Sequence, residues 1–157
     1  MDYVKLLNTL KQQELDLQFS SFTNEDAAII GLRLYERAKK ENLPITIDIT
    51  RNAHQLFHIS LPGTSLDNDQ WVLRKNKVVN RFQISSYHMG TLLKTQNSTL
   101  EDRFHISSME YAAHGGSFPI IIKQVGVIGT ITVSGLAQAD DHALVVDTIS
   151  EFLSNKL

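Results

Sequence analysis

The sequence predicts an α/β fold of the α+β type, in which helices surround a central antiparallel sheet of about five strands. Segments that alternate apolar and polar residues occur in two closely spaced pairs, which is typical of β-hairpins. Segments with apolar residues three and four positions apart lie before, between and after these pairs, as expected for helices that pack on a sheet. The 157 residues are 42% hydrophobic and 20% charged, which predicts a single domain over residues 1–157.

The N-terminal part is predicted to hold two helices joined by a short extended segment. Residues 2–13 carry a thin apolar stripe, and residues 15–19 alternate in polarity, which favours a short strand or an extended lead-in. Thr23-Asn24-Glu25-Asp26 matches a capping box, so the second helix should begin there and run to about Lys40. An asparagine and a proline that follow would end this helix.

The middle of the chain is predicted to form a hairpin and then two helices. Residues 45–50 alternate apolar and polar side chains, and residues 56–61 form the return strand. Possible N-caps at residues 65–68 predict a helix with one apolar and one basic side, and Ser85 or Ser86 can cap the next. Residues 94–111 are polar and predict a loop with short helical turns.

The last part of the chain begins with paired glycines, Gly115 and Gly116, which let another backbone or a ligand approach closely. Residues 118–122 and 127–133 predict a second hairpin. The return strand carries apolar residues on both faces, so it should be central in the sheet or buried by a neighbouring subunit. The final helix is expected to begin near Asp140.

Charge and residue content argue against several classes of protein. The net charge of −2 opposes a broad nucleic-acid-binding face, so no nucleic-acid partner is expected. The chain has no cysteine, which excludes disulfides and thiolate chemistry and fits a reducing cytoplasm. The N-terminal residues do not have the pattern of a signal peptide, and no apolar run is long enough to span a bilayer. We therefore expect a cytoplasmic protein without a membrane partner.

Two polar groups in the last part of the chain are candidates for chemistry. His114, followed by two glycines and Ser117, is typical of a loop that a ligand approaches, with the histidine as base, ligand or donor. The alternative is a tight turn that only positions the hairpin. Asp141 and His142 could act as an acid–histidine pair at a helix start, although helix capping is the simpler explanation of the acids.

The predicted helix after residue 68 carries the only basic cluster, Arg74, Lys75, Lys77 and Arg81. Such a cluster can bind carboxylates or phosphates, and Arg74 is the best candidate for this role. Lys75 and Lys77 are expected on a solvated helix face. Asp48 and His58 are expected to be packed or hydrogen-bonded on their strands, and the six histidines match no metal-binding motif, so no metal site is expected.

Several motifs in fixed order resemble the uncharacterised protein family 0303: LPITIDI, LFHISLPGTSLDNDQW, RKNKVV, SSY, AAHGGSFPI, GVIGTITVSGL and Q-x-x-DHALVV. That family is similar to the heme-degrading-domain proteins of the HbpS and GlcG group, and the resemblance covers roughly residues 20–153. It implies a profilin-like layered α/β/α sandwich that forms a homo-oligomer. The residues indicate no cofactor, whereas the resemblance makes heme a candidate.

The resemblance, together with the glycine turn, predicts a ligand site at the HGGSFP loop and the polar helix starts near it. The first hypothesis is a protein that binds a small molecule, with heme as the candidate ligand. The alternatives are a non-catalytic oligomeric scaffold or adaptor, and an enzyme that acts on a small anionic metabolite through Arg74, His114 and Asp141. No catalytic residue is assigned, and the expected ligand-binding residues are His114, Gly115, Gly116, Ser117, Phe118, Arg74, Asp141 and His142.

Overall fold

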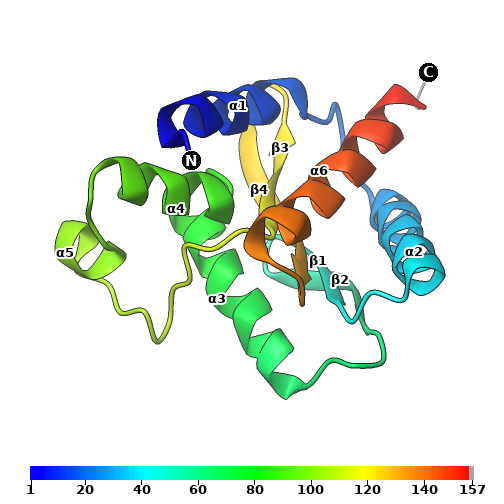
Figure 1. Ribbon diagram of the computed structural model, residues 1–157. Helices are drawn as coiled ribbons and strands as arrows, with labels where there is room; N and C mark the ends of the chain where they lie inside the picture. Colours follow the sequence, from blue (N-terminus) through cyan, green and yellow to red (C-terminus); the bar gives the residue numbers. More distant parts are fainter. Residues whose placement is uncertain (156–157) are drawn as a thin grey trace.

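A four-stranded sheet in the order β2-β1-β4-β3 forms the centre of the computed structural model, which describes residues 1–155 (Figure 1). The strands are β1 (Thr46–Arg51), β2 (His54–Ser60), β3 (Ser117–Ile122) and β4 (Gly126–Ser134). The pairs β1–β2 and β3–β4 are the two predicted hairpins, and β1 joins β4 in antiparallel register. The predicted α+β class with an antiparallel sheet is therefore confirmed.

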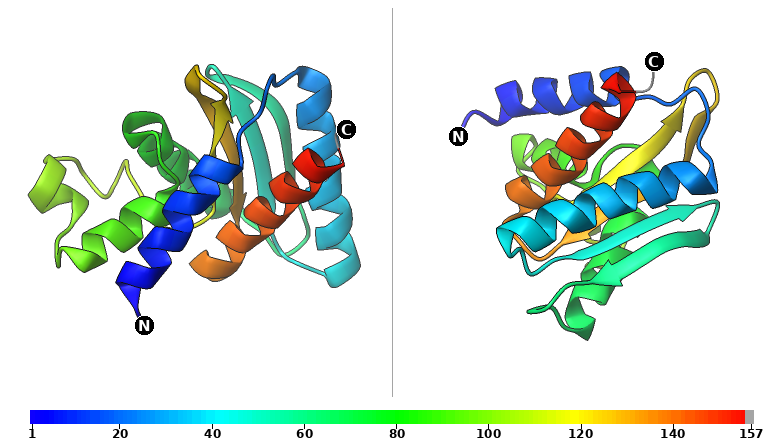
Figure 2. Two further views of the ribbon diagram at one scale, coloured as in Figure 1. Left: turned by 90° about the horizontal axis from the view of Figure 1, so that it is seen from above. Right: turned by 90° about the vertical axis from the view of Figure 1, so that its right-hand side faces the viewer.

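Six helices surround the sheet in the described residues: α1 (Tyr3–Asp16), α2 (Asn24–Glu41), α3 (Leu66–Phe82), α4 (Ser86–Thr95), α5 (Leu100–Phe104) and α6 (Gln138–Ser154). Helices α2 and α6 cover one face of the sheet and α3 covers the other, while α1 packs on α4 (Figure 2). None of the described helices is long and apolar enough to cross a membrane. The single domain over residues 1–157 stays a prediction, and its last two residues lie outside the described part.

Local signals place the starts of α2, α3 and α4 where the sequence predicts them. At α2 the Thr23 hydroxyl accepts a hydrogen bond from the Asp26 amide at 3.1 Å, and the Asp26 carboxylate accepts one from the Thr23 amide at 2.8 Å. This reciprocal pair is the predicted capping box. Ser65 and Asn68 form a second capping box at α3, whereas at α4 only the Ser85 hydroxyl acts as a cap, by accepting from the His88 amide.

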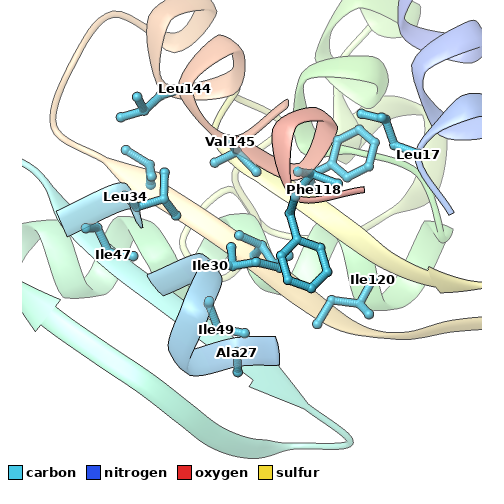
Figure 3. Close-up of a cluster of buried hydrophobic side chains, with 14 of the residues drawn as sticks. Leu17, Ala27, Ile30, Leu34, Ile47, Ile49, Phe118, Ile120, Leu144 and Val145 are labelled. Carbon is cyan, nitrogen blue, oxygen red and sulfur yellow. The ribbon is translucent and has the colours of Figure 1, made fainter. Parts of the chain in front are cut away.

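The two faces of the sheet differ in chemistry. Toward α2 and α6 the strands present apolar side chains that form the main core with both helices, among them Ile47, Ile49, Phe118 and Ile120 (Figure 3). Ile131 and Val133 of β4 belong to the same core. Toward α3 the alternate positions of the same strands are polar yet buried, namely Thr46, Asp48, Ser117, Thr130 and Thr132. A buried polar face needs hydrogen-bond partners, and α3 supplies several of them.

The expectation of about five strands is wrong, because residues 15–19 do not form a strand. Helix α1 continues to Asp16, and only Phe19 makes a bridge, to Ile122 at the outer edge of β3. The Phe19 amide donates to the Ile121 carbonyl at 2.8 Å, and its carbonyl accepts from the Lys123 amide at 2.9 Å. Five alternating residues are too short a pattern to distinguish a strand from the end of a helix.

Strand β4 is central, as its pattern predicts. It lies between β1 and β3, with α6 packed on one face and α3 on the other. Both faces are therefore covered within one chain, so the burial of β4 does not require a neighbouring subunit.

Candidate functional site

The HGG turn, residues 114–116, brings the backbone against the end of β4 and the start of α6. Gly116 has a φ of 136°, and a Cβ atom at this position would lie 2.8 Å from the Lys75 Nζ and closer still to the Val133 carbonyl oxygen. Only glycine adopts this backbone conformation readily and has no side chain to clash with these two atoms. The Gly115 amide donates to the Gln138 Oε1 at 3.1 Å, which ties the turn to the first turn of α6.

A buried ion pair lies directly behind this turn. The Lys75 Nζ is 3.2 Å from the Asp141 Oδ2 and donates to the Val133 carbonyl at 3.2 Å. The Asp141 carboxylate also accepts from the Gly135 amide at 3.2 Å and from the Leu136 amide at 2.9 Å. Lys75 is 3% exposed and Asp141 is 1% exposed, so the pair is almost wholly removed from solvent.

Burial shifts both members of this pair toward their neutral forms. Desolvation lowers the pKa of Lys75 below its usual range, and the charge of Asp141 opposes this shift only in part. Desolvation raises the pKa of Asp141, against the influence of the Lys75 charge and of the Leu136 and Gly135 amides. A proton shared by such a pair can move between them at a smaller free-energy cost than in water.

A polar cavity of about 290 Å³ opens beside the ion pair. Its lining includes Lys75, Asp141, Trp71, His114, Ser134 and Gln138. These residues come from α3, the HGG turn, the end of β4 and the start of α6, which are distant in sequence. The volume is at the small end of the range for ligand pockets.

Trp71 connects the two basic candidates at the edge of this cavity. The Arg74 guanidinium stacks over the indole ring at 4.3 Å from its centroid, and the His114 ring meets it edge-on at 5.5 Å between centroids. Arg74 itself lines a different cavity, on the side of α3 toward Asp48. The three convergent groups of the enzyme hypothesis are therefore brought near each other, with Asp141 and His114 in one cavity and Arg74 linked through Trp71.

His114 is the residue that several cavities share. Besides the polar cavity, it lines an apolar groove of about 380 Å³ with Leu93, Leu100 and Tyr111. It also lines a smaller cavity of about 200 Å³ between α1 and α4. Burial and the charges of Lys75, Lys94 and Arg74 lower the pKa of His114, so its imidazole is neutral at pH 7.

The remaining predicted site residues lie away from the polar cavity. Ser117 is buried, where its hydroxyl donates to the Asn76 Oδ1 at 3.0 Å, and Phe118 is part of the main core. The His142 ring packs against those of Tyr87 and Phe118, and its Nε2 lies 2.7 Å from the Gln13 Oε1. Asp141 and His142 are adjacent in sequence but point to different sides of α6, so they do not form a pair.

The expectation for Lys75 is wrong, because this lysine is buried and not solvated. The sequence contains a signal for this. Lys75 follows Trp71 by four positions and precedes Val78 by three, which places it within the apolar stripe of α3. A charged residue in such a stripe indicates a buried partner. Lys77, in contrast, has a side chain that is 51% exposed, as expected.

Comparison with known proteins identifies the family. The family model described as "Haem degrading protein HbpS-like" matches residues 22–150. A UPF0303 protein of Streptomyces coelicolor is 45% identical over 144 residues, which cover 92% of this chain and 91% of that protein. A UPF0303 protein of Edwardsiella ictaluri is 44% identical over 153 residues, which cover 98% of each.

Solved structures show the same fold. The crystal structure of the Ybr137w protein superposes with a TM-score of 0.88 at 35% identity, covering 96% of this chain and 90% of that one. The crystal structure of HbpS gives a TM-score of 0.65 at 17% identity, with coverage of 87% and 92%. A PduOC:heme complex gives 0.68 at 14% identity, with coverage of 83% and 94%. The family resemblance is thus confirmed, and the chain belongs to the HbpS-like family and to the UPF0303 proteins.

Proposed function

We propose that the chain is a ligand-binding protein and that its ligand is heme, held through His114. The position of this histidine carries the proposal, because its imidazole lies where the polar cavity and the apolar groove meet. The HbpS-like family and the heme complex of PduOC, a structural neighbour, support the choice of ligand.

The residues around His114 suit the chemistry of heme. A neutral imidazole has a free lone pair for iron, and the lowered pKa of His114 keeps the ring neutral. The groove beside it combines the side chains of Leu93 and Leu100 with the amine of Lys94. Apolar side chains suit the macrocycle and an ammonium group suits a propionate. When bound, heme supplies an iron centre capable of redox chemistry.

Optical titration with free hemin tests this proposal. Purified protein should give a saturable change in the Soret band, and His114→Ala should weaken the apparent affinity by at least roughly tenfold, because the iron loses its protein ligand. His54→Ala is the matched control, because His54 is an exposed histidine on the distant edge strand β2 and should leave binding unchanged. Non-saturable binding, or binding that survives His114→Ala unaltered, would reject the proposal.

The proposal includes self-association of the chain. Leu66, Leu73 and Met109 are apolar side chains that remain exposed in the single chain, and Leu73 and Met109 line the same cavity beside α3. Strand β2 is an edge strand, with β1 as its only strand partner in the described part of the chain. Exposed apolar residues next to a free sheet edge favour a second copy as the covering partner.

A further inference from the structure

The ion pair behind the HGG turn is not used by heme bound at His114. A lysine buried to this degree on a helix normally costs stability, and replacing a buried pair with apolar residues is often neutral or favourable. The pair is nevertheless placed at the wall of a cavity and not in the closed core. This placement suggests that the amine and the carboxylate act on something that enters the cavity.

The surroundings of Lys75 leave one side of its amine free. An ammonium group has three N–H bonds, and among the described residues two of them have acceptors, the Val133 carbonyl and the Asp141 carboxylate. The backbone of Gly116 packs closely against the Nζ, since a Cβ atom there would lie at 2.8 Å and would leave no room for the amine. A ligand would therefore reach this nitrogen from the polar cavity, which Lys75 lines.

We propose that Lys75 is a nucleophile that captures a small aldehyde or 2-oxo acid as a Schiff base in the polar cavity, with Asp141 as its acid–base partner. The proposal goes beyond heme binding and does not depend on it, because it uses a different cavity wall and a different nitrogen. The Lys75 Nζ and the Asp141 Oδ2, between which the required proton transfer takes place, are 3.2 Å apart.

The reaction needs no co-reactant. Lys75 first gives a proton to Asp141, which leaves a free amine and a carboxylic acid. The amine adds to the carbonyl carbon, the carbon–oxygen π bond breaks, and proton transfer gives a neutral carbinolamine. Asp141 then protonates the carbinolamine hydroxyl, which leaves as water while the nitrogen lone pair forms the C=N bond. The products are a protonated imine, one water molecule and the Asp141 carboxylate.

A carbonyl compound suits this cavity better than a simple anion does. The Asp141 carboxylate already neutralises Lys75, so the pair offers little net positive charge to a bound anion. Covalent capture does not depend on such a charge. The volume of about 290 Å³ limits the compound to a small one, and the Trp71 ring supplies an apolar wall. Burial favours the neutral amine that the addition step requires.

Reductive trapping of the wild-type chain without heme tests the proposal. The protein is incubated at neutral pH with glyoxylate and sodium cyanoborohydride, and the carboxymethylation of each lysine is followed by peptide mass spectrometry. Lys75 should be labelled at least roughly tenfold faster than Lys77, because Asp141 lies 3.2 Å from its amine as a general acid–base partner. A purely structural ion pair predicts the opposite order, because Lys75 is 3% exposed and the Lys77 side chain is 51% exposed.

Two substitutions on the same helix complete the experiment. Lys75→Arg keeps a cation opposite Asp141 but lacks the reactive amine, so the fast labelling phase should disappear. Lys77→Arg is the matched control and should retain it. The proposal is overturned if Lys75 in the wild-type protein is labelled at the same rate as Lys77 or more slowly. This comparison needs no variant, so a folding defect in Lys75→Arg cannot obscure the result. Hemin titration of the same samples tests heme binding through His114 independently of the labelling of Lys75.

Discussion

At the scale of single residues, His142 shows how burial decides the chemistry of a titratable group. Its ring is 4% exposed, and its Nε2 donates to the Gln13 Oε1 at 2.7 Å. Its Nδ1 is buried without a hydrogen-bond partner in the described part of the chain. Burial, and then the nearby His88, lower the pKa of His142 to about 4. The neutral ring is therefore the form that the folded chain accommodates.

This lowered pKa predicts that acid destabilises the protein. The unfolded chain binds a proton at His142 below about pH 6.5, whereas the folded chain does so only near pH 4, so stability is full above pH 6.5 and falls between these values. The contribution lost is about 3 kcal/mol. Urea unfolding at pH 7 and pH 4.5 should show a smaller difference in His142→Gln than in the wild type. An equal difference in both proteins would contradict the assignment, and His54→Gln serves as the control.

At the scale of elements, α3 is unusual because polar side chains hold it on the sheet. Its buried side carries Val72, Val78 and Val79, but Lys75 and Asn76 lie between them. The Asn76 Oδ1 accepts hydrogen bonds from the hydroxyls of Ser117 on β3 and Thr132 on β4. These contacts fix the position of α3 across two strands, and they place Lys75 opposite Asp141.

We expect Asn76→Ala to destabilise the fold by about 2 kcal/mol, because the two hydroxyls lose a buried acceptor. Asn80→Ala on the exposed side of the same helix should change stability by no more than about 0.5 kcal/mol. The free energy of unfolding from urea titration measures both. If the two variants are equally stable, the polar contacts of α3 with the sheet do not contribute to stability, and the helix is held by its valines alone.

At the scale of the whole molecule, the sheet is covered on both faces by one chain, but its outer surface is not entirely polar. Helix α3 exposes Leu66 and Leu73, and the loop after α5 exposes Met109. Single exposed apolar residues are ordinary on protein surfaces, whereas a group beside an edge strand indicates a contact surface.

Self-association through this surface predicts a concentration-dependent mass. Sedimentation at micromolar concentration should show a species larger than one chain, and Leu73→Glu should shift it toward the monomer. Leu32→Glu is the matched control, because Leu32 is a similarly exposed leucine, 52% against 55%, on a different helix. If the wild-type protein stays strictly monomeric, the proposed self-association is rejected. Hemin binding by the single chain is then tested on its own.

Much of the architecture follows from patterns that span only a few residues. The capping box at Thr23, the two hairpins and the paired glycines before Ser117 depend on neighbours close in sequence, so the sequence by itself determined them. The motifs in fixed order likewise predict the family correctly, because their order and spacing belong to the chain itself. The short alternation at residues 15–19 gave a wrong prediction of a strand. Local polarity does not decide whether a segment pairs with the edge of a sheet.

Only the tertiary structure decided the site. Lys75 and Asp141 are 66 positions apart, and Asp141 and His142 are neighbours that point to different surroundings. Whether a charged side chain is solvated or paired depends on which segments, distant in sequence, fold over it. A local sequence pattern contains only residues that are close in sequence, so it cannot identify those segments. The spacing of Lys75 within an apolar stripe could have indicated its burial. Its partner, the cavity beside it and the role of Gly116 arise from packing between α3, β4 and α6.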